Sequence, residues 1–299
     1  MTLEKILSDF KKIVSVDAFS GGRDGKVFFL SHYHSDHRPG LYEGWNKGQI
    51  VCSDLTGKFL RKLCKINGES VLTADENCWY DCFSDFEFCT HDANHCPGAY
   101  MFLFKYKHKK ILHTGDFRLN KSIEKWLIQN KPYDYVIADD TYYSAKGIYD
   151  FPSQESCIKK AVRIACANKD KEIFIGIYTL GKEKLLCAVS EALSCPIYVP
   201  DKMRKCFKIQ DLKYITSDKK ITNIYAYGMG YFSSEWFFFN PDNHVVIIPT
   251  GWQGTFSYNE HYHYIPYSEH CSSNEFKRFL DIVLPAYVYG HVSKLMLAR

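Results

Sequence analysis

The pattern of apolar and polar residues along the chain predicts two regions of different texture. Up to residue 140, short runs rich in aromatic and β-branched residues alternate with polar turns, as is typical of strands. Strands are expected at 26–32, 48–53, 86–93, 99–106, 109–115 and 133–140, with a helix at 56–66. From residue 152 a helix (152–170), a strand (172–178) and a second helix (181–193) follow one another. This alternation predicts an α/β unit with parallel strands.

The composition fits a folded chain in a reducing compartment. Of the 299 residues, 46% are hydrophobic and 16% aromatic, so the chain can form one large domain or two. The segment 1–14 is charged and helix-like, without the features of a signal peptide, and no run approaches the roughly 18 apolar residues of a membrane span. We therefore expect an intracellular protein whose twelve cysteines are reduced thiols.

Three local clusters have ordinary explanations. Cys78, Cys82 and Cys89 match no common spacing of zinc ligands, so we expect semi-buried thiols. The basic run 105–110 lies between two expected strands, which favours a solvated hairpin tip. The aromatic segment 230–239 can stack on nucleic-acid bases, but core packing is the expected use. The net charge of +4 permits a polyanionic partner without requiring one.

One short loop gathers groups that bind metal ions. Residues 31–37 read "SHYHSDH" and directly follow an apolar run. Further histidine and aspartate residues follow other expected strands: His95 in "DANHCPGA", Asp116 in "HTGDFR", and Asp139 with Asp140 in "IADDTYY". Loops that leave the same end of a sheet converge, so these side chains can form one site.

Histidine nitrogen and carboxylate oxygen are ligands that zinc prefers, and a pair of metal ions needs a bridging ligand. In this interpretation His32, His34 and His95 hold one ion. Asp36 and His37 hold a second, and Asp116 bridges the two. Two ions roughly 3.5–4 Å apart can stabilise an in-line displacement at phosphorus.

The motifs resemble those of a known family. "HYHSDH", "DANHCPGA" and "HTGDFR" are similar to the metal-binding motifs of the metallo-β-lactamase superfamily. "FPSQES", "YTLGKEK", "PTGW" and "IPYSEHCSS" resemble the β-CASP nucleases, in the DNA cross-link repair group of the Artemis, Apollo and yeast Pso2 type. The resemblance implies an α/β fold, namely a metallo-β-lactamase αββα sandwich with an inserted α/β β-CASP domain. The expected domains are 1–151, the insertion 152–256, and a return to the first domain at 257–299.

The resemblance also implies roles for individual residues. The implied metal ligands are His32, His34, Asp36, His37, His95, Asp116 and His270. His270, in "PYSEH", also matches the group that donates a proton to the departing oxygen near the second metal, and Asp139 matches the acidic residue that supports the ligands. Asp36, Asp139 and His270 are therefore the expected catalytic residues. The expected cofactor is Zn²⁺, with the first site firmer than the second.

Several positions depart from the family pattern. Asp140 stands where threonine is expected, which would add negative charge beside the metals. Cys271 replaces a serine. Val292 falls where DNA-processing members carry valine and RNA-processing members carry histidine, although His291 is adjacent.

The segment 176–182 satisfies G-x-x-x-x-G-K, but Glu183 follows where a P-loop needs serine or threonine. A strand that leads into a helix can still offer backbone N–H groups and a lysine to a phosphate. Gly181 and Lys182 are therefore the expected substrate-binding residues, with a plain strand–helix turn as the alternative.

The resemblance implies a zinc-dependent 5′-to-3′ DNA exonuclease that acts in interstrand cross-link repair in the nucleus, where a hydroxide held by the metals attacks the phosphodiester. The expected partner is DNA with single-stranded or frayed ends that carry a 5′ phosphate, and no membrane partner is expected. The alternatives are an Artemis-like structure-selective endonuclease, an RNA-processing nuclease, a small-ester hydrolase and a non-catalytic DNA-binding scaffold. "YTLGKEK" and "PYSEH" count against the hydrolase, and the intact ligand set counts against the scaffold.

Overall fold

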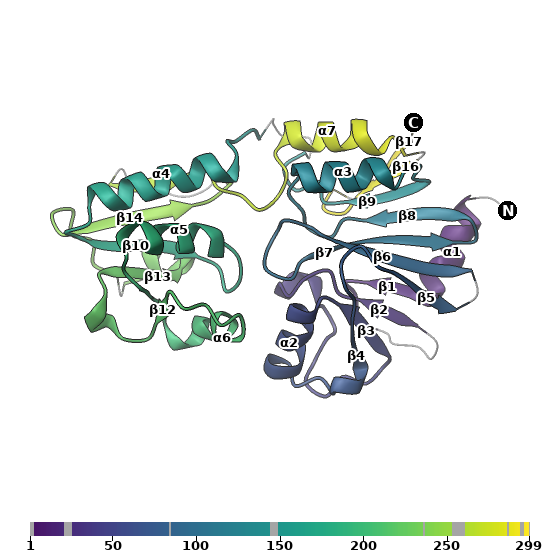
Figure 1. Ribbon diagram of the computed structural model, residues 1–299, viewed down its shortest axis with the longest axis horizontal. Coiled ribbons are helices and arrows are strands. Elements are labelled where there is room, and N and C mark those ends of the chain that lie inside the picture. Colours follow the sequence, from purple (N-terminus) through teal and green to yellow (C-terminus); the bar gives the residue numbers. More distant parts are fainter. Residues whose placement is uncertain are drawn as a thin grey trace. The chain divides into compact units, whose positions relative to one another are not determined.

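The protein divides into two compact units (Figure 1). Unit one consists of Met1–Asp150 and His270–Arg299, and unit two of Phe151–Glu269. Unit two is therefore inserted in sequence between two parts of unit one. The structure, a computed structural model, describes residues 3–20, 26–83, 85–143, 149–235, 237–252, 261–285, 287–293 and 296–298.

Unit one contains two sheets (Figure 1). The smaller has the strand order β1-β2-β3-β4, and its strands are parallel. The larger has the order β17-β16-β9-β8-β7-β6-β5, in which β5 to β8 pair antiparallel while β8, β9 and β16 run parallel. The strands are β1 Val14–Val16, β2 Val27–Phe29, β3 Gln49–Cys52, β4 Val71–Thr73, β5 Trp79–Phe83, β6 Phe86–Asp92, β7 Tyr100–Tyr106, β8 Lys109–His113, β9 Tyr135–Ala138, β16 Tyr287–Gly290 and β17 Met296–Ala298.

Aromatic side chains fill the space between these two sheets. Phe29 of β2 lies edge-on to Phe102 and Phe104 of β7, with ring centroids 5.1 and 5.0 Å apart. Helix α1 (Leu3–Ile13) adds Phe10, whose ring centroid lies 5.2 Å from that of Phe104. Each such fully buried side chain stabilises the fold by roughly 1.5–3 kcal/mol.

Helices cover the outer faces of unit one. Helix α2 (Asp54–Leu63) packs against β4 and buries Phe59 and Leu60, while α3 (Lys121–Gln129) and α7 (Ser273–Val283) lie side by side on the larger sheet (Figure 1). All three helices begin at a side chain that caps a backbone N–H group: Ser53, Asn120 and Ser272. The layers are helix, sheet, sheet and helix, which confirms the expected αββα sandwich.

The basic run 105–110 is a hairpin tip, as expected. β7 ends at Tyr106 and β8 begins at Lys109, so Lys107 and His108 form a two-residue turn. Both turn residues have positive φ, 46° and 64°, which matches the twist of a tight antiparallel hairpin.

Unit two is a parallel α/β unit. Its sheet has the order β12-β11-β13-β10-β14-β15, and every pair in it is parallel. The strands are β10 Glu172–Ile177, β11 Ile197–Tyr198, β12 Ile215–Thr216, β13 Ile224–Gly228, β14 His244–Pro249 and β15 Tyr262–Ile265. The helices are α4 Gln154–Ala167, α5 Glu183–Leu193 and α6 Asp201–Ile209. The α/β character expected for this part of the chain is confirmed.

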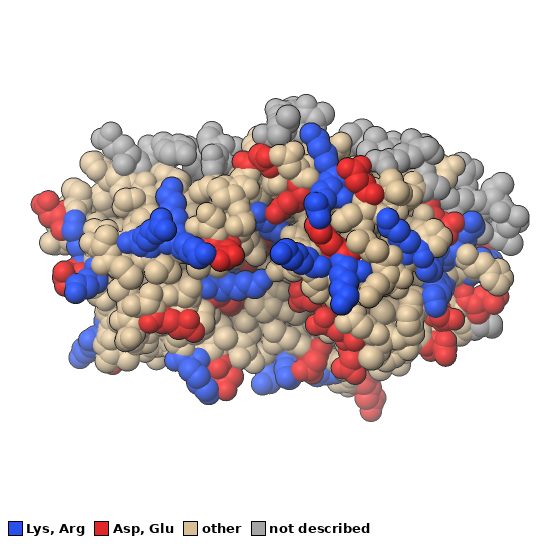
Figure 2. Space-filling model, turned by 45° about the horizontal axis from the view of Figure 1, so that its top comes forward, with Lys and Arg blue, Asp and Glu red and all other residues tan. Residues whose placement is uncertain are grey.

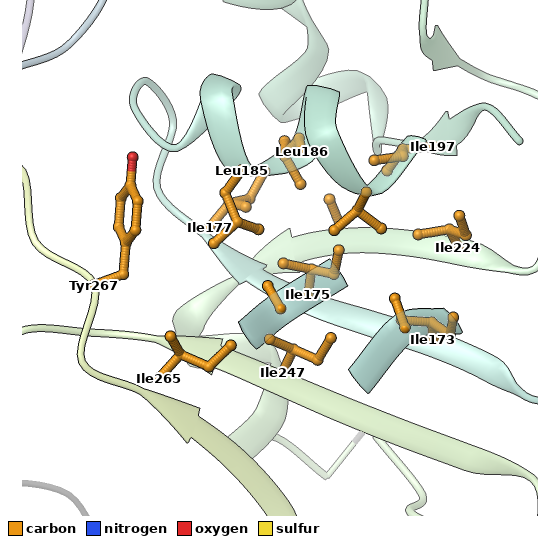
Figure 3. Close-up of a cluster of buried hydrophobic side chains, with 14 of the residues drawn as sticks. Ile173, Ile175, Ile177, Leu185, Leu186, Ile197, Ile224, Ile247, Ile265 and Tyr267 are labelled. Carbon is orange, nitrogen blue, oxygen red and sulfur yellow. The ribbon is translucent and has the colours of Figure 1, made fainter. Parts of the chain in front are cut away.

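The two faces of this sheet are covered differently. On one face Ile173, Ile175 and Ile177 pack against helices α4 and α5 (Figure 3). On the other face Phe174 packs against an aromatic segment, with the ring of Phe237 at 5.1 Å. Most of the described aromatic residues at 230–239 therefore serve the core, as expected, although Phe238 is 83% exposed.

The C-terminal limit of unit two differs from the expected insertion, 152–256. Strand β15 pairs with β14 inside the unit-two sheet, so the compact unit continues to Glu269. Two polar segments of the sequence, 144–152 and 253–262, are candidate linkers between domains, and most of their residues fall outside the described ranges. The assignment of evolutionary domains stays a prediction. Within the described part of the chain, no helix combines the length and apolar character that crossing a bilayer requires.

Candidate metal centre

The histidine-rich loop is anchored where β2 ends. Ser31 donates from its backbone N and its Oγ to the carboxylate of Asp17, at 2.7 and 2.6 Å. Its Oγ also lies 2.9 Å from Nδ1 of His32. This contact turns Nε2 of His32 toward the neighbouring ligand groups. The loop then forms a short 3₁₀ helix, η1 (Ser35–His37), which brings His37 back to the same place.

Histidine nitrogens converge as ligands of one metal ion would. Nδ1 of His34 lies 3.0 Å from Nε2 of His32 and 3.2 Å from Nε2 of His95. Zinc–nitrogen bonds of about 2.0–2.1 Å in tetrahedral geometry would set such nitrogens roughly 3.3 Å apart. The donor set and its spacing therefore fit a divalent ion.

Asp116 lies at the centre of the histidines. Its Oδ2 is 3.2 Å from Nε2 of His37, 3.7 Å from Nε2 of His32 and of His95, and 4.0 Å from Nε2 of His270. Burial raises the pKa of this carboxyl, but the charges of His270 and His37 outweigh burial and hold it well below its usual range. This one carboxylate therefore faces four imidazoles at the centre of the cluster.

Three overlapping groups of potential ligands occur among the described residues, with ligand atoms within 4.8 Å of one another. They are His32, His34, His95 and Cys96; His32, His37 and Asp116; and His95, Asp116 and His270. Cys96 was not predicted, although a thiol that directly follows His95 is a signal in the sequence. Asp36 belongs to none of these groups. Its side chain is 77% exposed, and its Oδ2 lies 3.8 Å from Nε2 of His37.

Sequence reasoning also missed Asp17. Its Oδ2 lies 2.8 Å from Nδ1 of His37, so Nε2 of that ring faces Asp116. Burial lowers the pKa of His37, but its hydrogen bonds with Asp116 and Asp17 raise it to about 11. Asp17 follows β1, so the rule that acidic residues at strand ends converge would have found it, had this three-residue strand been recognised.

Asp139 orients His270. Its Oδ2 lies 2.7 Å from Nδ1 of His270, and it accepts a hydrogen bond from the backbone N of Phe117 at 3.3 Å. Thr141 Oγ1 donates to the other carboxylate oxygen at 2.5 Å. Asp139 is buried, whereas the side chain of His270 is 24% exposed. The imidazole of His270 is therefore accessible to solvent for proton exchange, and the buried carboxylate of Asp139 fixes the orientation of the ring.

Cys271 anchors the backbone after His270. Its N donates to the carbonyl of Phe117 at 3.0 Å, and its Sγ accepts from the backbone N of Leu119 at 3.2 Å. Burial raises the pKa of this thiol well above its usual range, so the thiol stays protonated. The residue that replaces serine is thus a buried anchor.

Asp140 accepts hydrogen bonds from a distant turn of unit one. Its Oδ1 accepts hydrogen bonds from the backbone N of Val292 at 2.8 Å and of Ser293 at 3.1 Å. It belongs to none of the three ligand groups found among the described residues. The carboxylate faces two backbone donors near the C-terminal end of unit one, and its effect on the metals stays a prediction.

The expected phosphate contact at Gly181 and Lys182 stays a prediction. The backbone N of Gly181 donates to Glu183 Oε1 at 3.1 Å, and that of Lys182 donates to Glu269 Oε1 at 2.7 Å. The chain thus supplies its own anions to this helix start. Lys182 is only 3% exposed, its ammonium lies over the ring of Tyr178 at 3.9 Å, and burial lowers its pKa to about 8. In the structure this segment is a strand–helix turn held by carboxylates, which is the alternative that the sequence left open.

Comparison with known proteins agrees with this geometry. The αββα sandwich, with histidine and aspartate residues at its strand ends, defines a metallo-β-lactamase fold. A solved structure of a protein of unknown function from Enterococcus faecalis V583 is similar over 91% of this chain and 77% of its own, with a TM-score of 0.64. Its sequence identity of 13% limits that likeness to the fold.

Sequence relatives narrow the class to a family. Residues 209–296 match the DNA repair metallo-β-lactamase family. DNA cross-link repair protein SNM1 of Arabidopsis thaliana is 30% identical over 91% of this chain, and pso2/snm1 of Schizosaccharomyces pombe is 36% identical over 68%. 5′ exonuclease Apollo of Gallus gallus is 28% identical over 92%. The chain is similar to the DNA cross-link repair group of the metallo-β-lactamase/β-CASP family, a family whose fold implies binding of divalent metal ions. The alignments span 62%, 39% and 61% of the lengths of these relatives.

Proposed function

We propose that the chain is a zinc-dependent DNA nuclease that degrades DNA from the 5′ end and acts in interstrand cross-link repair in the nucleus. The observation that carries this proposal is the convergence of four histidines on one oxygen of Asp116. One of the four, His270, is also paired with Asp139. The names of the relatives, which include a 5′ exonuclease and DNA cross-link repair proteins, support the substrate and the polarity.

The ligand chemistry favours zinc. Imidazole nitrogens dominate the set, whereas magnesium and calcium sites are built mainly from oxygen. His32, His34 and His95 are the proposed ligands of the first ion, with Asp116 shared. His37 contributes to a second site, and His270 lies beside it. When bound, zinc lowers the pKa of a coordinated water to about 7 and neutralises charge at a phosphate.

The protein supplies orientation and a proton. Asp139 accepts the hydrogen bond from Nδ1 of His270, so Nε2 is the atom that can deliver a proton to the departing 3′ oxygen. Oδ2 of Asp116 lies 4.0 Å from this nitrogen. His270 is thus a general acid whose direction a buried carboxylate fixes. Asp36, exposed beside His37, can hold a water at the rim of the second site.

Surface charge contributes little to this proposal. On the face drawn in Figure 2, Lys and Arg side chains are interspersed with Asp and Glu. A mixed surface attracts a polyanion weakly, and the net charge is only +4. The proposal of DNA as the substrate therefore rests on the site and on the relatives.

The proposed function is tested by nuclease assays on matched single strands of DNA and RNA. A chelator should abolish cleavage of DNA, and Zn²⁺ added back should restore it. RNA should be cut more slowly, in line with Val292 at the position that separates DNA- and RNA-processing members. Faster cleavage of RNA would favour the RNA-processing alternative, and chelator-resistant cleavage would refute the metal-dependent mechanism.

A further inference from the structure

A carboxylate holds the turn that carries His291. The two hydrogen bonds from Val292 N and Ser293 N converge on one oxygen of Asp140, and the backbone N of His291 donates to the carbonyl of Ala138 at 2.7 Å. Three successive backbone N–H groups of this turn therefore have acceptors in the segment 138–140. We call residues 290–293 the C-terminal turn.

Gly290 makes room for this carboxylate. A Cβ atom built on Gly290 would overlap Oδ2 and Cγ of Asp140. Strand β16 ends at this glycine and pairs with β9, which ends at Ala138, so the two strand ends are adjacent. The pairing brings the C-terminal turn and Asp140 together, and the absence of a side chain at 290 lets the carboxylate enter.

The turn brings an imidazole onto the metal centre. The ring of His291 stacks on that of His37, with centroids 5.7 Å apart and planes inclined by 30°. It also lies edge-on to the buried His113, at 6.0 Å. His37 is thereby bounded on two sides, by Asp17 at Nδ1 and by His291 on its face.

We propose that Asp140 and the C-terminal turn form a backbone clamp that positions His291 against His37, which makes Asp140 and His291 positioning residues for the second metal site. This inference rests on the proposed function only in that His37 is taken as a metal ligand. The carboxylate holds the turn because one of its oxygens accepts two backbone hydrogen bonds. The clamp does not depend on the negative charge of Asp140.

That distinction gives a sharp test. Asp140→Asn keeps an oxygen that can accept both backbone hydrogen bonds but removes the charge, whereas Asp140→Ala removes both. Zinc stoichiometry and affinity should be measured by competition with a chromophoric chelator, without any nucleic acid. Asp140→Ala should lower the affinity for the more weakly bound zinc ion about tenfold or more, which is the typical effect of removing a residue that supports a metal ligand. In Asp140→Asn the same affinity should stay within about threefold of the wild type.

His291 is tested in the same assay. His291→Ala should weaken the same zinc as Asp140→Ala, while the matched control His108→Ala, at the exposed hairpin tip, should change nothing. Gly290→Ala should weaken zinc binding as Asp140→Ala does, because the added methyl group displaces the carboxylate. In an Asp140→Ala background, the same substitution should lower the zinc affinity less. This coupling separates the clamp from a general loss of stability, which the urea unfolding of the metal-free variants measures directly.

Each outcome bears on the clamp alone. Equal weakening in Asp140→Asn and Asp140→Ala would overturn the clamp in favour of a charge effect. Unchanged zinc affinity in Asp140→Ala and His291→Ala would overturn it outright. Because no nuclease reaction is measured, a wild-type protein that binds two zinc ions but cuts no DNA would refute the proposed function and leave this test intact.

Discussion

Nδ1 of His270 lies 2.7 Å from Oδ2 of Asp139, although 131 residues separate the two. The intervening chain contains the whole of unit two, and the pair lies in unit one. The insertion therefore interrupts a single site, which the returning chain completes with its first residue. The backbone around His270 is anchored on each side: Gln154 Nε2 donates to the carbonyl of Ser268, and Cys271 N donates to that of Phe117.

Because His270 is the proposed proton donor, its removal should slow turnover. His270→Ala should leave the zinc held by His32, His34 and His95 in place but lower kcat by roughly 10²–10⁴-fold, because the proton donor is lost. KM should change little if the histidine acts mainly in the transition state. Steady-state kinetics on a DNA oligonucleotide, with zinc analysis of the same sample, measures both. A near-normal kcat would remove His270 from the chemistry.

Asp116 should be the most sensitive ligand. Asp116→Ala should abolish nuclease activity and lower zinc content, because its oxygen faces four imidazoles. Circular dichroism should report an intact fold. The matched comparison is Asp36→Ala, whose exposed carboxylate contacts only the edge of the site and should matter less for zinc content. Unchanged zinc content in Asp116→Ala would exclude the bridging role.

Asp17 should strengthen zinc binding at the second site by holding His37, although Asp17 is not itself a proposed ligand. Asp17→Asn removes the negative charge at Nδ1 of His37 and should weaken the second zinc about 10- to 100-fold, as is typical for carboxylates that hold a ligating histidine. Chelator competition measures this affinity directly. The first zinc, held by the other histidines, should keep its affinity, and a loss of both ions would instead indicate a disturbed fold.

The buried Lys182 should make stability depend on pH. In the folded protein its pKa falls to about 8, mainly through burial, whereas the unfolded chain keeps the ordinary value of 10.5. Between these values the unfolded state binds more protons, so the free energy of unfolding rises with pH, by at most about 1.4 kcal/mol per pH unit. Urea unfolding from pH 7.5 to 10.5 should reveal this rise in the wild type relative to Lys182→Met. Identical slopes in the two proteins would contradict the burial of an ammonium group.

The sequence was informative wherever elements were long or strongly patterned. The strands at 99–106 and 172–178 and the helix at 152–170 lie where their apolar spacing predicts them. Strands of two or three residues, such as β1, β11 and β12, carry too few residues for a pattern, and neighbouring strands stabilise them instead. Asp17 was missed for this reason.

For the site, residue types could be predicted from the sequence, but their partners could not. The structure brings His32, His34, His37, His95, Asp116 and His270 together, while their binding of zinc stays a prediction. The role of Asp140 depends on a contact with a turn about 150 residues later, which no local pattern encodes. The contact at the start of helix α5 has a similar cause, because Glu269, which accepts from the backbone N of Lys182, is distant in sequence.

The central claim is a metal-dependent nuclease that attacks DNA from its 5′ end. The most direct measurement is digestion of single-stranded DNA labelled at either end, with a 5′ phosphate or a 5′ hydroxyl, using Asp116→Ala and a chelator as controls. We expect the wild type to release mononucleotides from the 5′ end, faster when that end is phosphorylated, and both controls to be inactive. Cleavage at internal positions would favour a structure-selective endonuclease, and digestion only from the 3′ end, or in the chelator control, would contradict the claim.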